Sequence, residues 1–385
     1  MTKTELTANI YPTTASIDAE VWNSLVPATN NVADNPFLAH EFFLALENSG
    51  SATPKTGWQP QHIIIERAGQ PVALMPLFLK SHSQGEYVFD HGFAQAFERA
   101  GGQYYPKLQS AIPFTPVTAA KLLVPSGERA LKEALLSTAK QLAKQFGVSS
   151  VHATFVPETE EKLASENNWL TRHDTQFHWS NNGFISFDDF LFSLSSRKRK
   201  AIRRERKQAL AAGLKIEWLS GDQISESHWE RFFAFYQDTG GRKWGQPYLT
   251  REFFTALGQS MAERIVLMMA HDGNEYIAGA LNLLGKDTLY GRYWGCSRQV
   301  PFLHFEMCYY QAVDYAINHG LKIVEAGAQG EHKLARGYRP VKTRSVHWFA
   351  DPGLSRAVAD YLDEERLAVS HDQDDMARLS PFKNK

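Results

Sequence analysis

Cysteine is nearly absent from this sequence of 385 residues, which contains only Cys296 and Cys308. Two cysteines exclude a framework of several disulfides and a four-cysteine zinc site, and they are typical of a reducing compartment. The chain also lacks an apolar run of the ~18 residues that a membrane span needs, and its first twelve residues contain no apolar core of signal-peptide length. We therefore expect a cytoplasmic protein with no membrane span.

An excess of charge of one sign is missing as well. The formal net charge is −1, from 41 basic and 42 acidic residues. The field of the whole chain therefore does not indicate binding to nucleic acid or to an anionic membrane, and only local charge can do so. A metal-ligand spacing is also lacking among the 14 histidines, so no metal site is predicted. With 43% hydrophobic and 22% charged residues, the composition is that of an ordinary globular protein long enough for two domains.

What the sequence does contain is a repeat. The segment Pro36–Leu46 (PFLAHEFFLAL) recurs as Pro247–Leu257 (PYLTREFFTAL), with seven of eleven positions identical. Each segment reads as the start of a helix, with apolar residues three and four positions apart. Because further similar segments follow in the same order in both halves of the sequence, we predict two copies of one domain.

After these helices, each copy is predicted to form an antiparallel meander. The turns between the β-rich runs contain glycine, which is the usual signal of hairpins. The predicted strands are Gln61–Glu66, Pro71–Lys80 and Glu86–His91 in the first copy, and Arg264–Ala270, Tyr276–Leu284 and Thr288–Trp294 in the second.

Each copy then continues with a long helix that ends at a glycine. The predicted helices are Glu128–Phe146 before Gly147, and Phe302–His319 before Gly320. A strand, a short helix and a last strand close each copy. This order predicts an α/β fold of the α+β type, a mixed sheet with helices on both faces, and it excludes a purely parallel doubly wound sheet. The predicted borders are 1–185 for the first domain, 186–213 for a basic linker helix and 214–385 for the second domain.

The order of elements resembles the GNAT acyltransferase fold, and its duplicated form resembles the FemAB-type peptidoglycan aminoacyltransferases. The sequence is identified as a member of the FemAB-like predicted N-acyltransferases. The segments that carry this resemblance are Pro36–Leu46, Ser195–Gly213, Arg292–Gly295 and Glu325–Pro340. The resemblance implies two tandem GNAT-like domains, and an enzyme that transfers an acyl or aminoacyl group to an amine.

One segment departs from the pattern of the acetyl-CoA-dependent relatives. These usually carry a glycine-rich loop before the long helix, where free backbone amides bind pyrophosphate. The corresponding stretch here, Cys296–Phe302 (CSRQVPF), contains no glycine, and Pro301 has no backbone N–H. No permanently bound cofactor is expected. The co-substrate implied by the resemblance is acyl-CoA or aminoacyl-tRNA, and the missing glycines argue against coenzyme A.

The predicted reactive centre follows the closing strand of the second copy. Strand alternation places Glu325 and Gly327 on one face of a central strand, where an unpaired carboxylate is costly. Acyl transfer to an amine needs a base and a donor for the developing oxyanion. We predict Glu325 or His332 as the base, and Arg336 or a nearby backbone amide as the donor. The alternatives are a structural ion pair between Glu325 and Arg336, and a merely solvated His332.

A second set of side chains is predicted to bind substrate. They comprise Arg292, Tyr293, Trp294, His304, Glu306, Gln329, Lys333 and His91. Residues 292–294 end a meander strand, and 90–92 are their counterpart in the first copy. The alternatives are that the aromatic residues belong to the core, and that His304 and Glu306 only satisfy the amides of the first helical turn.

The link between the copies is strongly basic. Arg197–Lys207 contains eight cations in eleven residues and is predicted to lie on a helix that Gly213 ends. Such a density of charge can bind the phosphates of a tRNA, a nucleotide-linked substrate or a lipid pyrophosphate. The predicted phosphate-binding residues are Arg197, Arg199, Lys200, Arg203 and Arg204. The alternative is a solvated linker helix.

Together these features predict an N-acyltransferase that modifies an amino group of a small or cell-envelope-related acceptor, such as a cell-wall precursor, with tRNA as a further expected partner. The alternative is a non-catalytic protein that binds an anionic, phosphate-bearing ligand. Nucleic-acid binding of a general kind is disfavoured by the neutral charge of the chain. Nothing in the sequence indicates an oligomeric state.

Overall fold

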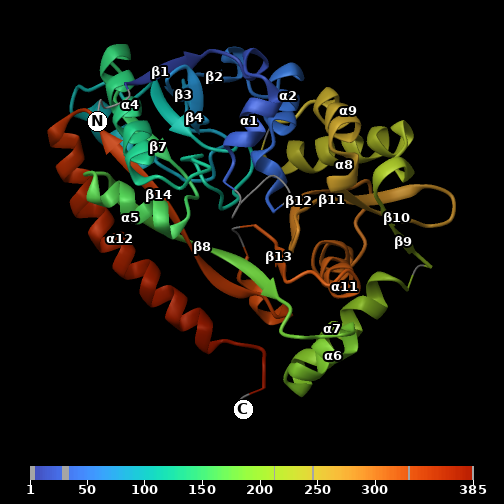
Figure 1. Cartoon of the computed structure of the whole chain (residues 1–385). Helices are drawn as coiled ribbons and strands as arrows, with labels where there is room; N and C mark the ends of the chain where they lie inside the picture. Colours follow the sequence, from blue (N-terminus) through green and yellow to red (C-terminus); the bar gives the residue numbers. More distant parts are fainter. Residues whose placement is uncertain (1–4, 28–33, 212, 245–246, 328–329, 384–385) are drawn as a thin grey trace. The chain divides into compact units, whose positions relative to one another are not determined.

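The protein is described by a computed structural model that covers residues 5–27, 34–211, 213–244, 247–327 and 330–383 (Figure 1). The chain forms two compact units, and neither is continuous in sequence. The first unit comprises Met1–Asp174 and Lys342–Ser370, and the second comprises Thr175–Val341 and His371–Lys385. The domain borders predicted from the repeat stay a prediction, because the compact units follow contacts rather than sequence similarity.

The first unit contains two groups of strands. One is an antiparallel sheet in the order β1-β3-β4, and the other runs β2-β5-β6-β7-β14. In the second group, as far as its strands are described, β6 and β7 are parallel and the other neighbours are antiparallel. The strands are β1 (Leu6–Tyr11), β2 (Trp58–Pro60), β3 (His62–Arg67), β4 (Gln70–Met75), β5 (Phe78–Lys80), β6 (Lys107–Ser110), β7 (Ser150–Ala153) and β14 (Arg339–Phe349).

The helices of the first unit cover an apolar face of these strands. In α4, Leu131, Leu135 and Leu142 recur on one side and pack with Leu108 of β6 and Val151 of β7 in one core. The helix ends where Gly147 adopts a left-handed conformation, as its sequence predicts. The helices are α1 (Ala19–Leu25), α2 (His40–Asn48), α3 (His91–Arg99), α4 (Arg129–Phe146), α5 (Glu158–Glu166) and α12 (Pro352–Arg378), whose last residues belong to the second unit.

The second unit has a mixed sheet in the order β8-β13-β12-β11-β10-β9. Its only parallel neighbours among the described strands are β12 and β13. The strands are β8 (Leu170–Ser180), β9 (Lys215–Leu219), β10 (Ile265–His271), β11 (Tyr276–Leu284), β12 (Thr288–Cys296) and β13 (Ile323–Glu325). The helices are α6 (Phe187–Ser193), α7 (Ser196–Ala209), α8 (Glu226–Trp244), α9 (Arg251–Ser260), α10 (Leu303–Phe305) and α11 (Gln311–Asn318).

The long helix predicted over 302–319 contains a π-helical turn. α10 leads into the π turn at Glu306–Tyr310, and α11 follows directly. Met307, Tyr310 and Val313 of this continuous segment are buried in the core of the second unit. Single π turns inside helices are frequent at functional sites, because they change the direction of the side chains around them.

The two copies exchange their last strands. β8, which closes the first copy, pairs with β13 of the second copy from Ser180 to His178. β14, which closes the second copy, pairs with β7 of the first copy from Phe349 to Val346. The discontinuity of both compact units follows from this exchange.

The predicted strand Glu86–His91 is wrong. The strand that runs parallel to β7 is β6, at Lys107–Ser110. It lies between the predicted strand Glu86–His91 and the predicted helix Glu128–Phe146, where no element was predicted. His91 instead begins α3, which Asp90 precedes. β6 carries the sequence KLQS and is buried at every position, so it shows no apolar run by which a strand is recognised.

The prediction of a mixed α/β fold is confirmed by these sheets and helices. None of the helices within the described residues has the length and apolar character to span a membrane.

Candidate functional site

In the second unit, two parallel strands part at the predicted reactive centre. β12 and β13 pair from Thr288 with Ile323 to Tyr290 with Glu325. β13 then ends, whereas β12 continues to Cys296 along its other neighbour, β11. Beyond Tyr290, β12 is therefore no longer paired with β13, and the chain after Glu325 leaves the sheet.

A β-bulge lies at the point where the strands part. Leu281 pairs with Tyr293 and Asn282 pairs with Gly291, so Arg292 is an extra residue in β12. Bulges are common beside active sites because they change the direction of a side chain. A Cβ atom on Gly291 would lie 3.2 Å from the carbonyl oxygen of Glu325. A glycine at this position therefore allows the two backbones to approach closely.

The bulge turns Arg292 toward the carboxylate of Glu325. Nη2 of Arg292 donates to Oε2 of Glu325 at 2.9 Å, and the arginine side chain is 2% exposed. His178 is the cross-strand neighbour of Glu325, with its Nε2 atom 3.8 Å from Oε1. Glu325 is thus ion-paired with Arg292, which corrects the alternative of a pair between Glu325 and Arg336.

His178 is the titratable group that the sequence analysis did not select. Burial lowers the pKa of its imidazole, although the charge of Glu325 acts in the opposite direction. A neutral imidazole beside a carboxylate can accept a proton at neutral pH. A signal in the sequence that could have found it is the recurrence of the pair His178-Trp179 as His347-Trp348.

Lys333 joins the short helix after β13 to the end of that strand. This 3-10 helix spans Glu331–Arg336. Nζ of Lys333 donates to the carbonyl oxygens of Ala326 at 2.6 Å and Gly327 at 3.0 Å, and burial lowers the pKa of Lys333 to about 8. Lys333 thus fixes the path of the chain beyond Glu325.

Arg336 is held by the inner face of the basic helix. Its Nη2 atom donates to Oε2 of Glu205 in α7 at 2.8 Å, and Nη1 donates to the carbonyl of His332 at 2.7 Å. The guanidinium lies 3.5 Å from the ring centre of Phe305, and Tyr310 donates a short hydrogen bond to the same Glu205 oxygen. Glu205 is the one acidic residue among eight cations, and its role was not predicted.

The structure brings several predicted side chains together along an aromatic row. Trp294 contacts His304 edge to face at 5.4 Å, and His304 lies 5.4 Å from the ring of Tyr309. The hydroxyl of Tyr309 is 3.0 Å from Nε2 of His332. The residue His332 is exposed overall. Partial burial of its ring lowers its pKa, and so do the charges of Arg336 and Lys333. Tyr293 points elsewhere and packs against Tyr236 at 5.4 Å.

Glu306 is fully buried, and its carboxylate is occupied by protein groups. Arg206 of α7 binds Oε1 of Glu306 at 2.9 Å and Asp314 at 2.8 Å, and Gln311 donates to Glu306 at 2.7 Å. With 0% exposure of its side chain, Glu306 anchors α7 to the π turn. The predicted contact of Glu306 with a substrate would require this network to open.

The predicted phosphate-binding residues lie on different faces of α7. Arg197, Lys200 and Arg204 are exposed. Arg203 pairs with Asp188 at 2.7 Å, and the guanidinium of Arg199 lies 5.3 Å from the ring centre of Phe192.

One predicted substrate-binding residue is not part of this arrangement, and another cannot be placed. His91 is exposed at the start of α3 in the first unit, with its ring 6.4 Å from that of Phe89. Gln329 lies outside the described residues. The described residues also contain no group of three His, Cys, Asp or Glu side chains that could hold a metal ion.

The first unit contains a second polar cluster, which the sequence analysis missed. Lys107 of β6 is fully buried, and its ammonium contacts Glu86 at 2.7 Å and Asp90 at 2.5 Å. The hydroxyl of Tyr104 donates to Asp90 at 2.7 Å. Lys80 lies 3.9 Å from Glu86 and 3.5 Å from the ring centre of Trp58. Because removal of one partner would leave a buried charge unpaired, the cluster is a strong structural constraint.

Burial changes the proton affinity of this cluster. It lowers the pKa of Lys80 to about 7 and raises the pKa of Glu86 to about 7. Lys107 and His152 hold the pKa of Asp90 well below its usual range, against the opposing effect of burial. The charge of this face of the first unit therefore changes near neutral pH.

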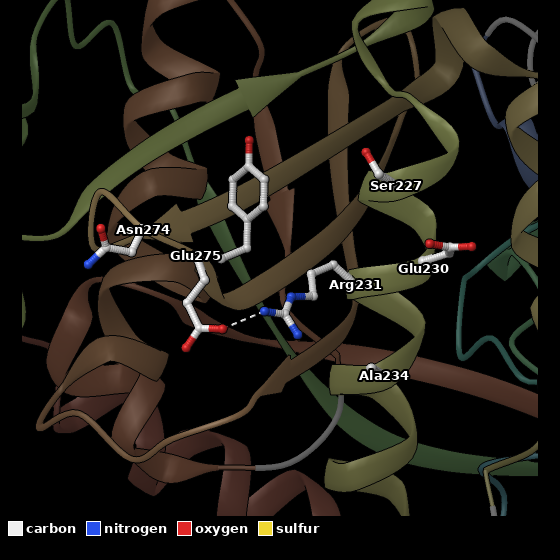
Figure 2. A pocket seen from close by; sticks show the side chains of 7 residues that line it. Ser227, Glu230, Arg231, Ala234, Asn274 and Glu275 are labelled. Carbon is white, nitrogen blue, oxygen red and sulfur yellow. Dashed lines mark hydrogen bonds and ion pairs between the residues drawn. The ribbon is translucent and has the colours of Figure 1, made fainter.

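A shallow surface groove of the second unit lies elsewhere. α8 lines one side of it and the turn between β10 and β11 lines the other, and Arg231 pairs with Glu275 at 2.5 Å (Figure 2). Further lining residues are Ser227, Glu230, Ala234, Asn274 and Tyr276. None of them is a predicted site residue, and the groove contains no buried titratable group. We therefore place the candidate site at the parting of β12 and β13.

The fold is that of the duplicated GNAT-type acyltransferases. A family model described as FemAB-like, peptidoglycan biosynthesis/recognition, matches residues 13–384, and the chain belongs to this family.

Solved structures support the fold. The crystal structure of FemX is 13% identical with a TM-score of 0.53, and the match covers 89% of this chain and 98% of FemX. The C-terminal domain of a putative lysylphosphatidylglycerol synthetase from Agrobacterium fabrum is 9% identical with a TM-score of 0.53, over 91% of this chain and 97% of that one. L-PGS from Bacillus licheniformis is 9% identical with a TM-score of 0.50, over 84% and 96%. A search of curated proteins found no match.

Proposed function

We propose that this protein transfers an acyl or aminoacyl group to the amino group of a cell-envelope-related acceptor, and that the reaction takes place in the second unit. The observation that carries this proposal is the bulge at Arg292, where β12 and β13 part beside Glu325 and His178. Membership of a family described by peptidoglycan biosynthesis/recognition supports the kind of acceptor.

The geometry suggests a role for His178 in proton transfer. The neutral imidazole takes a proton from the attacking amine, whose nitrogen forms a bond to the acyl carbon. The bond from that carbon to the leaving oxygen or sulfur then breaks, and the leaving atom receives the proton from His178. Glu325 stabilises the transient imidazolium, and Arg292 holds Glu325 in place. This assignment proposes His178 as the base, where the sequence predicted Glu325 or His332, and keeps Glu325 as its partner.

The predicted roles of Arg336 and His332 stay predictions. Both contact the aromatic row that ends at Trp294, and the exposed imidazole of His332 is accessible to a bound acceptor. Arg336 already has Glu205 and the carbonyl of His332 as partners. We therefore propose Arg336 as a positioning residue for the segment that carries His332.

The donor we favour is an aminoacyl-tRNA rather than an acyl-CoA. The N–H of Leu303 at the start of α10 is bonded to the carbonyl of Val300, and Pro301 has no N–H. Two positions next to the start of the helix therefore offer no free amide to a pyrophosphate. The cations of α7 offer the charge that a tRNA backbone requires. A protein of similar fold is a putative lysylphosphatidylglycerol synthetase, which is named after a lysylated lipid.

The test is transfer of a labelled group to amine acceptors in the purified protein. Donors are acyl-CoAs of increasing length and aminoacyl-tRNAs, and acceptors include UDP-linked peptidoglycan precursors. With the donor and acceptor that give product, His178→Gln is expected to lower turnover by ~10²- to 10⁴-fold, because a positioned base contributes about that much. His271→Gln, a histidine in the hairpin of the same unit, is the matched control. Full activity of His178→Gln would overturn the assignment of the base.

The alternative is a binding protein for an anionic ligand, which the exposed cations of α7 favour. It predicts that a phosphate-bearing ligand raises the melting temperature while no donor gives product.

A further inference from the structure

We propose that one corner of the second unit docks on the surface of an anionic lipid bilayer. The corner consists of residue 185, α6, α7 and residues 379–383, and we call it the α6–α7 corner. This inference assigns the exposed cations of α7 to a membrane in place of the tRNA contact considered above. Its test does not depend on the proposed reaction, because none of the exposed side chains that carry it contacts Glu325 or His178 in the described residues.

The two faces of α7 carry different kinds of contacts. On the inner face, Ile202 is buried, Glu205 binds Arg336, and Arg206 binds Glu306. On the outer face, the exposed cations recur three and four positions apart at Arg197, Lys200, Arg204 and Lys207. None of these four forms an ion pair within the described part of the chain. The outer face is therefore a row of positive charges that the protein itself does not neutralise.

Large apolar side chains are exposed beside this row. Ile185 is 89% exposed, Phe192 is 56% exposed and Leu379 is 66% exposed. They are the exposed large hydrophobic residues of the second unit, as far as it is described. Single exposed apolar residues are normal, whereas groups of them mark interaction surfaces. The grouping of these three residues in one corner therefore indicates an interaction surface.

Hydrogen bonds hold the segment of Leu379 next to the end of α6, where Phe192 lies. The N–H of Ser195 donates to the carbonyl of Pro381 at 2.9 Å, and the N–H of Lys383 donates to the carbonyl of Ser193 at 3.0 Å. Leu379 is two residues from Pro381, which limits its distance from the junction of α6 and α7. Phe192 lies next to two cations of α7, with the guanidinium of Arg203 5.9 Å from its ring centre.

A hollow of about 400 Å³ lies between α6 and α7. Ser186, Phe187, Leu191, Arg203 and Arg206 line it together with Asp188. The charge of Asp188 is paired with Arg203. Asp189, the other acid of α6, accepts a hydrogen bond from the N–H of Ile185 at 3.2 Å. The acids of α6 are thus engaged, and the outward charge of the corner is positive.

Cations beside exposed aliphatic side chains fit a membrane surface better than a nucleic acid. Lys and Arg near an anionic leaflet are attracted to its headgroups, and apolar side chains gain free energy at the boundary between headgroups and acyl chains. Ile185 and Leu379 have no π face on which a base can stack. The neutral net charge of the chain does not oppose this docking, because the membrane field decays within a Debye length and acts on the nearest charges.

The experiment is cosedimentation of the full-length protein with phosphatidylcholine vesicles that contain or lack 30% phosphatidylglycerol. Binding is expected only to the anionic vesicles and is expected to decrease with added salt. Charge reversal by K200E, R204E and K207E together should weaken partitioning by at least about a hundredfold, since the loss of three cations alone would give that much. I185S and F192S together should weaken it by at least about tenfold at unchanged charge.

The matched control is the pair K144E and F146S at the exposed end of α4, which combines a lost cation with a lost exposed apolar residue in the other unit. This control should bind like the wild-type protein. Circular dichroism verifies that each variant is folded.

Two outcomes would overturn the proposal. One is vesicle binding that is unaffected by I185S and F192S. The other is an absence of vesicle binding together with binding of a tRNA that only the charge reversals weaken, which would assign the corner to a nucleic acid.

Discussion

Two buried histidines, one from each copy of the repeat, meet inside the first unit. Nδ1 of His152 lies 2.7 Å from Nδ1 of His347, and both side chains are about 1% exposed. One nitrogen must donate and the other must accept, so two neutral rings would carry different tautomers. Burial lowers the pKa of His347 to about 3 and holds the pKa of His152 well below its usual range.

These histidines should make the first unit sensitive to acid. Between pH 6.5 and 3 the unfolded chain binds a proton at residue 347 that the folded chain does not bind, so stability is lost as the pH falls. For each such histidine the loss is about 1.4 kcal/mol per pH unit. H347Q removes the contribution of one histidine to this loss. The free energy of unfolding should therefore depend less steeply on pH in H347Q than in the wild-type protein. Urea denaturation at pH 6, 5 and 4 measures this, and parallel dependences in both proteins would contradict it.

At the residue level, the sequence indicated where chemistry is placed but not which groups are paired. Glu325, Trp294, His304 and His332 were selected because polar and aromatic residues follow the meander and the closing strand, and the structure gathers them into two neighbouring contact groups. The partner of Glu325 was unpredictable, because it depends on a one-residue bulge that strand periodicity does not reveal.

At the scale of elements, the ends of helices were more predictable than the strands of the first copy. α4 ends at Phe146, as its terminal glycine indicated. The linker helix predicted over 186–213 is instead two helices, α6 (Phe187–Ser193) and α7 (Ser196–Ala209), and α7 carries the basic run. β6 could not be predicted, since buried Lys107 and Gln109 are stabilised by tertiary partners that no local pattern shows.

The glycine that ends α4 allows a test of its conformation alone. Gly147 has a φ of +65°, and a Cβ atom added to it would meet nothing within 4 Å. G147A should therefore destabilise the protein by ~1 kcal/mol, because an L-residue is strained in the left-handed region. G92A in α3 is the matched control, since that site is equally open and has no positive φ; it should be neutral or stabilising. Equal effects at both positions in denaturant titrations would contradict this explanation.

At the scale of the whole molecule, the exchange of closing strands means that neither copy completes its own sheet. Val346 of β14 is buried in the same core as Val151 of β7 and Leu135 of α4. α12 also contributes Leu354, Val358 and Leu362 to a cluster with Phe93 of α3. The first unit therefore depends on residues from the far end of the sequence.

A chain that stops at residue 341 should not fold its first unit. It lacks the part of β14 that pairs with β7, which leaves β7 with an open edge, and it lacks the apolar residues of α12. We expect rapid proteolysis of residues 5–174 in this truncated chain, whereas the full-length protein should resist under the same conditions. A protease-resistant fragment of the first unit in the truncated chain would contradict this dependence.

The exchange also has a consequence for synthesis on the ribosome. Residues 1–174 are synthesised long before β14 leaves the exit tunnel. The first copy therefore lacks the strand that pairs with β7 while almost half of the chain is translated. During this interval the edge of β7 is available to any other nascent strand, including a second copy of the same polypeptide on a neighbouring ribosome. Synthesis rate and chaperone supply, rather than the stability of the finished fold, would then limit the yield of active protein.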